Sequence, residues 1–149
     1  MNIVAVEDDY LQAEWLKETL ELVLQGCAVE IVPTESRFRD RFGQWETNPP
    51  DLFIIDVMLA WDHPRKNSPE PPPEVDEGGF QRAGLRCQAL LADNEVLRRV
   101  PVVFYTVLDR DVLERELPRW PGGVSFLKKG DSQDKLLELV KLRTAKRQP

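Results

Sequence analysis

Short runs of consecutive apolar residues alternate along the chain with longer stretches in which apolar residues recur every three or four positions. An unbroken apolar run of four or five residues is typical of a strand buried on both faces, and the longer spacing is typical of an amphipathic helix. The runs predict strands at 3–6, 28–32, 52–55, 102–105 and 124–127. The intervening segments predict helices at 10–24, 34–45, 80–97 and 109–117, and a last helix that Asp131 or Ser132 caps.

Strands that alternate with helices predict a doubly wound α/β fold, with a five-stranded parallel sheet and helices on both faces. Parallel strands need long crossover connections, and these are right-handed. With 149 residues and 42% hydrophobic residues, the chain is long enough for one domain with a sizeable core. We therefore expect residues 1–149 to form a single domain without a separate output domain.

The pattern breaks after the third strand, where residues 60–77 carry five prolines and several charges. Proline removes a backbone donor and does not fit the interior of a helix or of a central strand. We therefore predict an insertion of about 60–77 that is extended or partly disordered, has polyproline character and contains no helix. It is either a tolerated surface insertion or a segment that recognises a partner or covers a pocket, with Trp61 as its candidate anchor.

Composition excludes several classes of function. The net charge of -6 gives no indication of a nucleic-acid surface. No segment reaches the ~20 apolar residues needed to span a bilayer, and no signal-peptide pattern precedes the first strand. The single histidine, His63, excludes a multi-histidine metal site. We therefore expect a cytoplasmic protein that does not bind nucleic acid or membrane directly.

Polar residues follow four of the predicted strands. Glu7 and Asp8 follow the first, Asp56 the third, Thr106 the fourth and Lys129 the fifth. The carboxyl ends of parallel strands share one edge of the sheet, so we expect these side chains to converge. Clustered carboxylates suit Mg²⁺, and Mn²⁺ would also fit. A carboxylate such as Asp56 can attack phosphorus, while an ammonium and a hydroxyl stabilise the charge that develops on the phosphoryl oxygens.

Four segments resemble the receiver domain of bacterial two-component response regulators: IVAVEDD (3–9), PDLFIIDVM (50–58), PVVFYT (101–106) and FLKK (126–129). The resemblance covers nearly the whole chain except the insertion and implies a flavodoxin-like, receiver-type fold. It implies that Asp56 accepts a phosphoryl group from a histidine kinase or phosphotransfer protein and that a downstream protein target responds. It also implies that Mg²⁺ binds Asp8, Asp56 and the backbone carbonyl of Met58, with Glu7 acting through a metal-bound water.

The same resemblance implies that Thr106 and Phe126 are the hydroxyl and aromatic switch residues and that Lys129 is the lysine of the family. Lys128 competes for that role. The family places its lysine three residues after the aromatic residue, which favours Lys129. A regular strand would also direct the two lysines to opposite faces.

Three features depart from the family pattern: the insertion, Gly130 where the family usually has proline, and Val107 where it usually has a very small residue. We expect a stand-alone receiver that catalyses at most its own phosphoryl transfer and is not otherwise an enzyme. The departures leave open a phosphorylation-independent adaptor. A Mg²⁺-dependent phosphatase with an aspartyl nucleophile is a further alternative, although Met58 stands where such enzymes carry a second aspartate. Whether the chain forms a homodimer stays open.

Overall fold

The computed structural model describes residues 1–117 and 119–145. Its strands are β1 (Asn2–Val6), β2 (Ala28–Val32), β3 (Leu52–Ile55), β4 (Val102–Thr106) and β5 (Val124–Lys128). Its α-helices are α1 (Tyr10–Val23), α2 (Glu35–Thr47), α3 (Pro73–Gly78), α4 (Ala83–Asp93), α5 (Arg110–Glu116) and α6 (Gln133–Ala145). Two single 3-10 turns, η1 (Phe80–Arg82) and η2 (Leu97–Arg99), flank α4.

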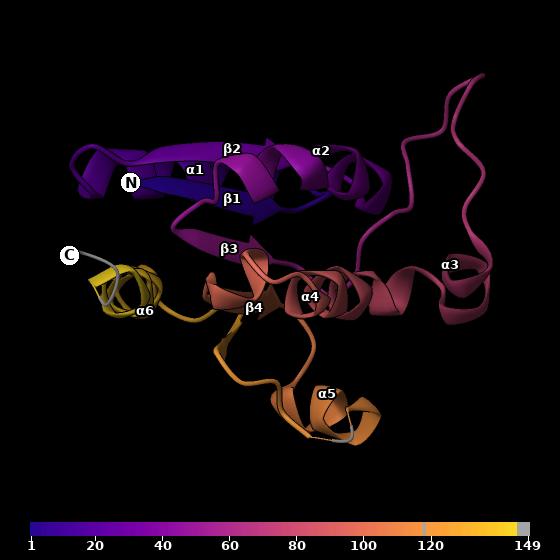
Figure 1. The fold of residues 1–149 in the computed structure, drawn as a ribbon. Coiled ribbons are helices and arrows are strands. Elements are labelled where there is room, and N and C mark those ends of the chain that lie inside the picture. The colour runs from indigo at the N-terminus through magenta and orange to yellow at the C-terminus, as the bar shows by residue number, and fades with distance from the viewer. Residues whose placement is uncertain (118, 146–149) are drawn as a thin grey trace.

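The strands form one sheet in the order β2-β1-β3-β4-β5, and every neighbouring pair is parallel (Figure 1). The predicted doubly wound, five-stranded parallel sheet is therefore confirmed. The register places Val6, the last residue of β1, beside Ile55, the last residue of β3. The polar residues that follow these two strands consequently begin side by side at the carboxyl edge of the sheet.

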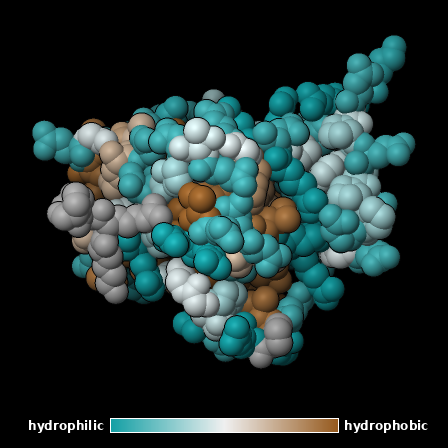
Figure 2. Space-filling model, viewed as in Figure 1, coloured by the Kyte–Doolittle hydropathy of each residue, from teal (hydrophilic) through white to brown (hydrophobic). Residues whose placement is uncertain are grey.

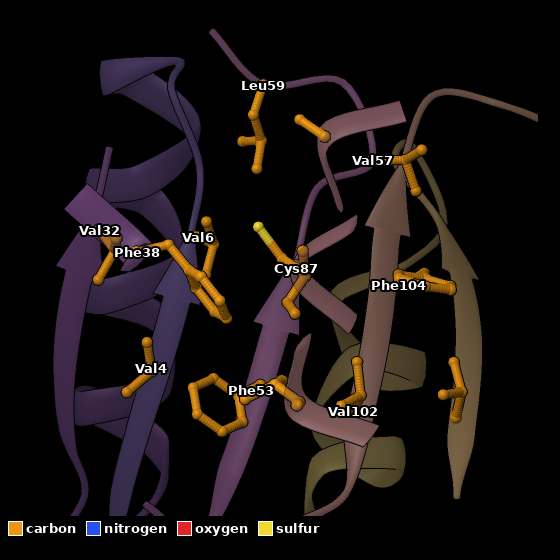
Figure 3. Close-up of a cluster of buried hydrophobic side chains, with 14 of the residues drawn as sticks. Val4, Val6, Val32, Phe38, Phe53, Val57, Leu59, Cys87, Val102 and Phe104 are labelled. Carbon is orange, nitrogen blue, oxygen red and sulfur yellow. The ribbon is translucent and has the colours of Figure 1, made fainter. Parts of the chain in front are cut away.

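Each face of the sheet has its own apolar core. Helices α1 and α6 cover one face, where Leu16 and Leu136 pack against Ile3, Ala5 and other strand residues. Helices α2, α4 and α5 cover the other face. Side chains of β1, β3 and β4 point into this second core, and Figure 3 labels Val4, Val6, Phe53, Val102 and Phe104 among them. The same view labels Phe38 of α2 and Cys87 of α4, which belong to the same core.

The prediction that the insertion contains no helix is wrong, because residues 73–78 form α3. Pro73 lies in the first turn of this helix, where its missing N–H and fixed φ are tolerated. Val75 is only 5% exposed, so α3 is held by a buried apolar contact. Tertiary packing therefore orders a part of the segment that its proline content alone would leave extended.

The predicted helix at 80–97 is also wrong in its extent, because it begins with η1 and α4 ends at Asp93. The Asn94 side chain accepts hydrogen bonds from the backbone N–H groups of Val96 (3.0 Å) and Leu97 (2.9 Å) and starts a separate turn. Leu97 is fully buried in the same core as Leu91, so the apolar spacing continues past the end of the helix.

Helix α6 begins after Ser132, whose hydroxyl accepts a hydrogen bond from the Lys135 N–H at 3.4 Å. Pro118, Lys146 and Arg147 lie outside the described residues. Within residues 1–117 and 119–145, no helix combines the length and the apolar character that crossing a membrane requires.

Candidate functional site

The three predicted carboxylates meet at the carboxyl edge of the sheet. One oxygen from each of Glu7, Asp8 and Asp56 lies within 4.8 Å of the other two. Glu7 and Asp56 are buried, whereas Asp8 is half-buried. Hard oxygen atoms that converge in this way fit a divalent cation such as Mg²⁺, which keeps several water ligands and needs few from the protein.

Backbone N–H groups orient each of these acids. The N–H of Asp9 donates to Glu7 Oε1 (3.1 Å), and the N–H of Met58 donates to Asp56 Oδ1 (3.2 Å). The N–H of Ala60 donates to Asp8 Oδ2 (2.9 Å). Because Ala60 is the first residue of the insertion, the insertion begins in direct contact with the carboxylate cluster.

Lys129 supplies the positive charge of the cluster. Its Nζ lies 2.5 Å from Asp56 Oδ2 and 2.5 Å from Glu7 Oε2, and its side chain is 10% exposed. The backbone N–H of Lys129 donates to the carbonyl oxygen of Thr106 at 2.8 Å, which ties the lysine to the end of β4. Lys128 is exposed and forms an ion pair with Asp109 instead. The structure therefore brings Lys129, and not Lys128, to Asp56.

One ammonium shared between two carboxylates leaves the cluster short of positive charge. Burial raises the pKa of Glu7 to about 6; the hydrogen bond from Lys129 opposes this shift, and the nearby Asp56 adds to it. Burial alone would lower the pKa of Lys129, but its hydrogen bonds to Asp56 and Glu7 outweigh burial and raise it. The ammonium is therefore firmly protonated, and a further cation would relieve the repulsion among the carboxylates.

Glu7 should make the stability of the metal-free protein depend on pH. Its pKa is raised from 4.5 to about 6 in the fold, so the unfolded chain loses its proton first as the pH rises. Glu7 therefore contributes stability that is fully present below pH 4.5 and is lost through pH 6, a change of about 2 kcal/mol. Urea unfolding of wild type and of Glu7→Gln, which does not titrate, measures this difference. A gap between the two proteins that is constant from about pH 4 to 8 would contradict the assignment.

Thr106 and Phe126 lie on neighbouring strands next to this cluster. Thr106 ends β4 and is fully buried, and its Oγ1 faces the N–H of Leu108 at 3.5 Å. Phe126 is half-buried in β5 and packs edge-on against Trp120, with ring centroids 6.5 Å apart. Trp120 in turn packs against Phe104 of the core. Phe126 therefore packs, through Trp120, against the core on the face of the sheet that α5 covers.

The base of the insertion is ordered. The indole N–H of Trp61 donates to the Pro69 carbonyl (2.8 Å), and the Arg39 guanidinium lies 5.6 Å from the centre of the Trp61 ring. The carbonyls of Ala60 and Trp61 accept from the first N–H groups of α2. Figure 1 shows the segment between β3 and α3 projecting from the sheet, and Figure 2 shows hydrophilic residues covering this projection. Trp61 is thus an anchor of the insertion.

The other two departures from the family pattern have different surroundings. Val107 is 57% exposed, so its side chain extends into solvent at the rim of the site. Gly130 has a φ of +96°, a conformation that residues with a Cβ rarely adopt and that proline excludes. The turn after Lys129 is therefore built for glycine.

Solved structures that resemble the chain are receiver domains. The signal receiver domain of a signal transduction histidine kinase from Syntrophus aciditrophicus is 28% identical, with 99% of this chain and 94% of that one covered and a TM-score of 0.68. The chain has the receiver-domain fold. The Francisella response regulator 1452 receiver domain is 18% identical, with 99% of this chain and 98% of that chain covered and a TM-score of 0.68.

The receiver domain of the sensor histidine kinase PA1611 from Pseudomonas aeruginosa PAO1 is 18% identical, with 97% of each chain covered and a TM-score of 0.67. That structure has a magnesium ion coordinated in its active-site cleft. No protein-family model and no curated protein matches the chain. The receiver fold, which is that of signalling domains, is therefore established by structure rather than by a sequence family.

Sequence reasoning missed two features close to the carboxylate cluster. Glu35 is fully buried at the start of α2 and binds Arg39 and Arg86. Gly84 of α4 donates its N–H to the Val57 carbonyl (2.9 Å) and lies against the backbone of Asp56. An acid in the first turn of a helix gives no signal of burial, since most such acids are solvated. A glycine within a helical pattern is a weak signal of close backbone approach.

Proposed function

We propose that this receiver accepts a phosphoryl group on Asp56 from the phosphohistidine of a histidine kinase or phosphotransfer protein, with Mg²⁺ as cofactor. Phosphorylation would then change its contacts with a downstream protein. The observation that carries the proposal is the position of Lys129 Nζ, 2.5 Å from Asp56, within a cluster of three carboxylates. A buried acid that faces both an ammonium and a cation-binding set of oxygens is arranged to take up a phosphoryl group.

In the transfer, an oxygen of Asp56 forms a bond to phosphorus while the bond between phosphorus and the donor's histidine nitrogen breaks. The histidine nitrogen keeps the electron pair of that bond. Asp8, Asp56 and the Met58 carbonyl would hold Mg²⁺, with Glu7 acting through a water, and the ion would supply counter-charge to the phosphoryl oxygens. The Lys129 ammonium and the Thr106 hydroxyl can each donate a hydrogen bond to another phosphoryl oxygen. Thr106 and Phe126 would then act as the switch residues.

Beryllofluoride, which mimics a phosphoryl group on a carboxylate, is expected to bind the wild-type protein in the presence of Mg²⁺ and not to bind Asp56→Asn. Fluorine NMR or calorimetry measures the binding. Lys129→Ala should bind about 10- to 100-fold more weakly, because a hydrogen bond to a charged group is lost. Asp51→Asn is the matched control, since Asp51 precedes the same strand at its opposite end and bonds the N–H of Asn2.

Circular dichroism establishes that each protein is folded before its binding is measured. Folded wild type that fails to bind beryllofluoride would overturn the proposal and favour the phosphorylation-independent adaptor. Sustained hydrolysis of small phosphomonoesters that depends on Asp56 would favour the phosphatase instead.

A further inference from the structure

The Lys129 side chain needs to be held in place by contacts, because its backbone fixes only the position from which the side chain starts. The turn that follows contains Gly130, with a φ of +96°, and is closed by a hydrogen bond from the Asp131 N–H to the Lys128 carbonyl (3.1 Å). The side chain itself has a flexible four-carbon stem. The hydrogen bond from its N–H to the Thr106 carbonyl fixes the backbone but leaves this stem free to turn.

An aromatic ring lies beside the ammonium. Nζ of Lys129 is 5.9 Å from the centre of the Tyr105 ring, and Tyr105 is only 3% exposed. The ring of Trp15, from α1, stacks on Tyr105 with centroids 6.5 Å apart and planes 21° apart. Tyr105 also belongs to the core between the sheet and helices α1 and α6. The ring is therefore held from several sides and offers a fixed surface to the lysine.

The attraction between an ammonium and an aromatic face adds to the two ion pairs from another direction. The carboxylates of Asp56 and Glu7 bind Nζ on one side, and the ring borders it on another. A buried ring also excludes water from the stem and strengthens the remaining charge interactions. Contacts with Asp56, Glu7 and the Tyr105 ring, which come from three different strands or their ends, together fix the position of Lys129 Nζ. The two carboxylates alone would let the lysine side chain rotate about them.

We propose that Tyr105 is a positioning residue that holds the Lys129 ammonium against Asp56. The effect of this positioning on phosphoryl transfer rests on the proposed function, but the contact between the Tyr105 ring and Lys129 does not. Tyr105 does not touch the reacting atoms; it acts through Lys129. The ring, rather than the hydroxyl, carries the effect.

Two substitutions distinguish the effect of the aromatic ring from that of a buried apolar side chain. Tyr105→Phe keeps the aromatic face, and Tyr105→Leu keeps a buried apolar side chain without it. NMR of the Lys129 εCH₂ protons should show an upfield ring-current shift in wild type and in Tyr105→Phe that Tyr105→Leu loses. Affinity for beryllofluoride with Mg²⁺ should fall about 2- to 30-fold in Tyr105→Leu, as the strength of such contacts indicates, and stay within about twofold in Tyr105→Phe.

Val103→Ala is the matched control, because Val103 is fully buried on the same strand and in the same core. It should destabilise the fold and leave both readouts unchanged. If Tyr105→Leu does not fold, Tyr105→Met replaces it. Unshifted Lys129 signals in wild type, or equal beryllofluoride affinity in the leucine and phenylalanine variants, would overturn the proposal. If wild type binds no beryllofluoride, the proposed function fails, while the Lys129 shift still decides whether the ring positions the lysine.

Discussion

Replacing Glu35 with alanine is expected to destabilise the fold by about 3–5 kcal/mol, because it leaves the Arg86 guanidinium, only 14% exposed, without its carboxylate partner. Glu35 is fully buried. Its Oε1 accepts from Arg39 (3.0 Å) and from Arg86 Nε (2.9 Å), and its Oε2 accepts from Arg86 Nη2 (2.6 Å). Arg39 Nε and Arg86 Nη1 are already buried without a hydrogen-bond partner among the described residues. Loss of the carboxylate would add to this deficit.

Urea unfolding of Glu35→Ala and of Asp40→Ala tests this expectation. Asp40 lies in the same helix and pairs with Arg37 at 3.9 Å, but both side chains are at least half exposed. An exposed pair contributes only about 0–1 kcal/mol, so Asp40→Ala should be nearly neutral. The double variant Glu35→Ala/Arg86→Ala should lose less unfolding free energy than the sum of the losses in the two single variants, because both changes remove the same ion pair. Equal effects of Glu35→Ala and Asp40→Ala would show that the buried network is not needed for stability.

This network also accounts for the order at both ends of the insertion. Arg39 contacts Glu35, the Trp61 ring and Glu74 of α3 (3.0 Å). It therefore joins the first and last parts of the insertion to helix α2. Because Ala60 also donates to Asp8, the insertion is connected to the carboxylate cluster by one hydrogen bond and to the α2–α4 surface by this arginine.

The strands were predictable from the sequence to within one residue at each end. Central strands of a parallel sheet are buried on both faces, so a short unbroken apolar run such as 52–55, bounded by polar residues and prolines, strongly favours a strand. The convergence of Glu7, Asp8, Asp56 and Lys129 followed from the same logic, since the carboxyl ends of parallel strands share one edge. The structure brings these four side chains together, and the roles assigned to them stay predictions.

The remaining features depend on contacts between residues that are far apart in the chain. Glu35 and Arg86 are separated by 51 positions, and nothing local marks either as buried. Helix α3 exists because Val75 reaches the protein interior and Glu74 reaches Arg39, and neither contact is encoded in the proline pattern around them. The Tyr105–Lys129 contact likewise depends on side-chain directions. Apolar periodicity specifies the elements, but it does not specify which polar groups meet between them.

Replacing Gly84 with alanine is expected to disrupt the candidate site directly. A Cβ at this position would lie 2.6 Å from the Val57 Cα and 2.9 Å from the Asp56 carbonyl carbon, and it would also overlap the Asp56 carbonyl oxygen. These are backbone atoms, so no flexible side chain can move aside. Either α4 must separate from β3 or the Asp56 backbone must shift, and overpacking of this kind costs about 1–3 kcal/mol or more.

Gly43→Ala is the matched control for Gly84→Ala. Gly43 lies within α2, where an added Cβ would have only the flexible Glu46 side chain nearby, at 3.9 Å. Glycine within a helix is less favourable than alanine by about 0.5–1 kcal/mol, so Gly43→Ala should stabilise the protein. The two Gly→Ala changes should therefore have opposite signs in urea unfolding. Only Gly84→Ala should also weaken Mg²⁺-dependent beryllofluoride binding, because only this change displaces Asp56, the proposed phosphoacceptor. A Gly84→Ala protein as stable as Gly43→Ala, with beryllofluoride affinity like that of wild type, would show that α4 does not constrain Asp56.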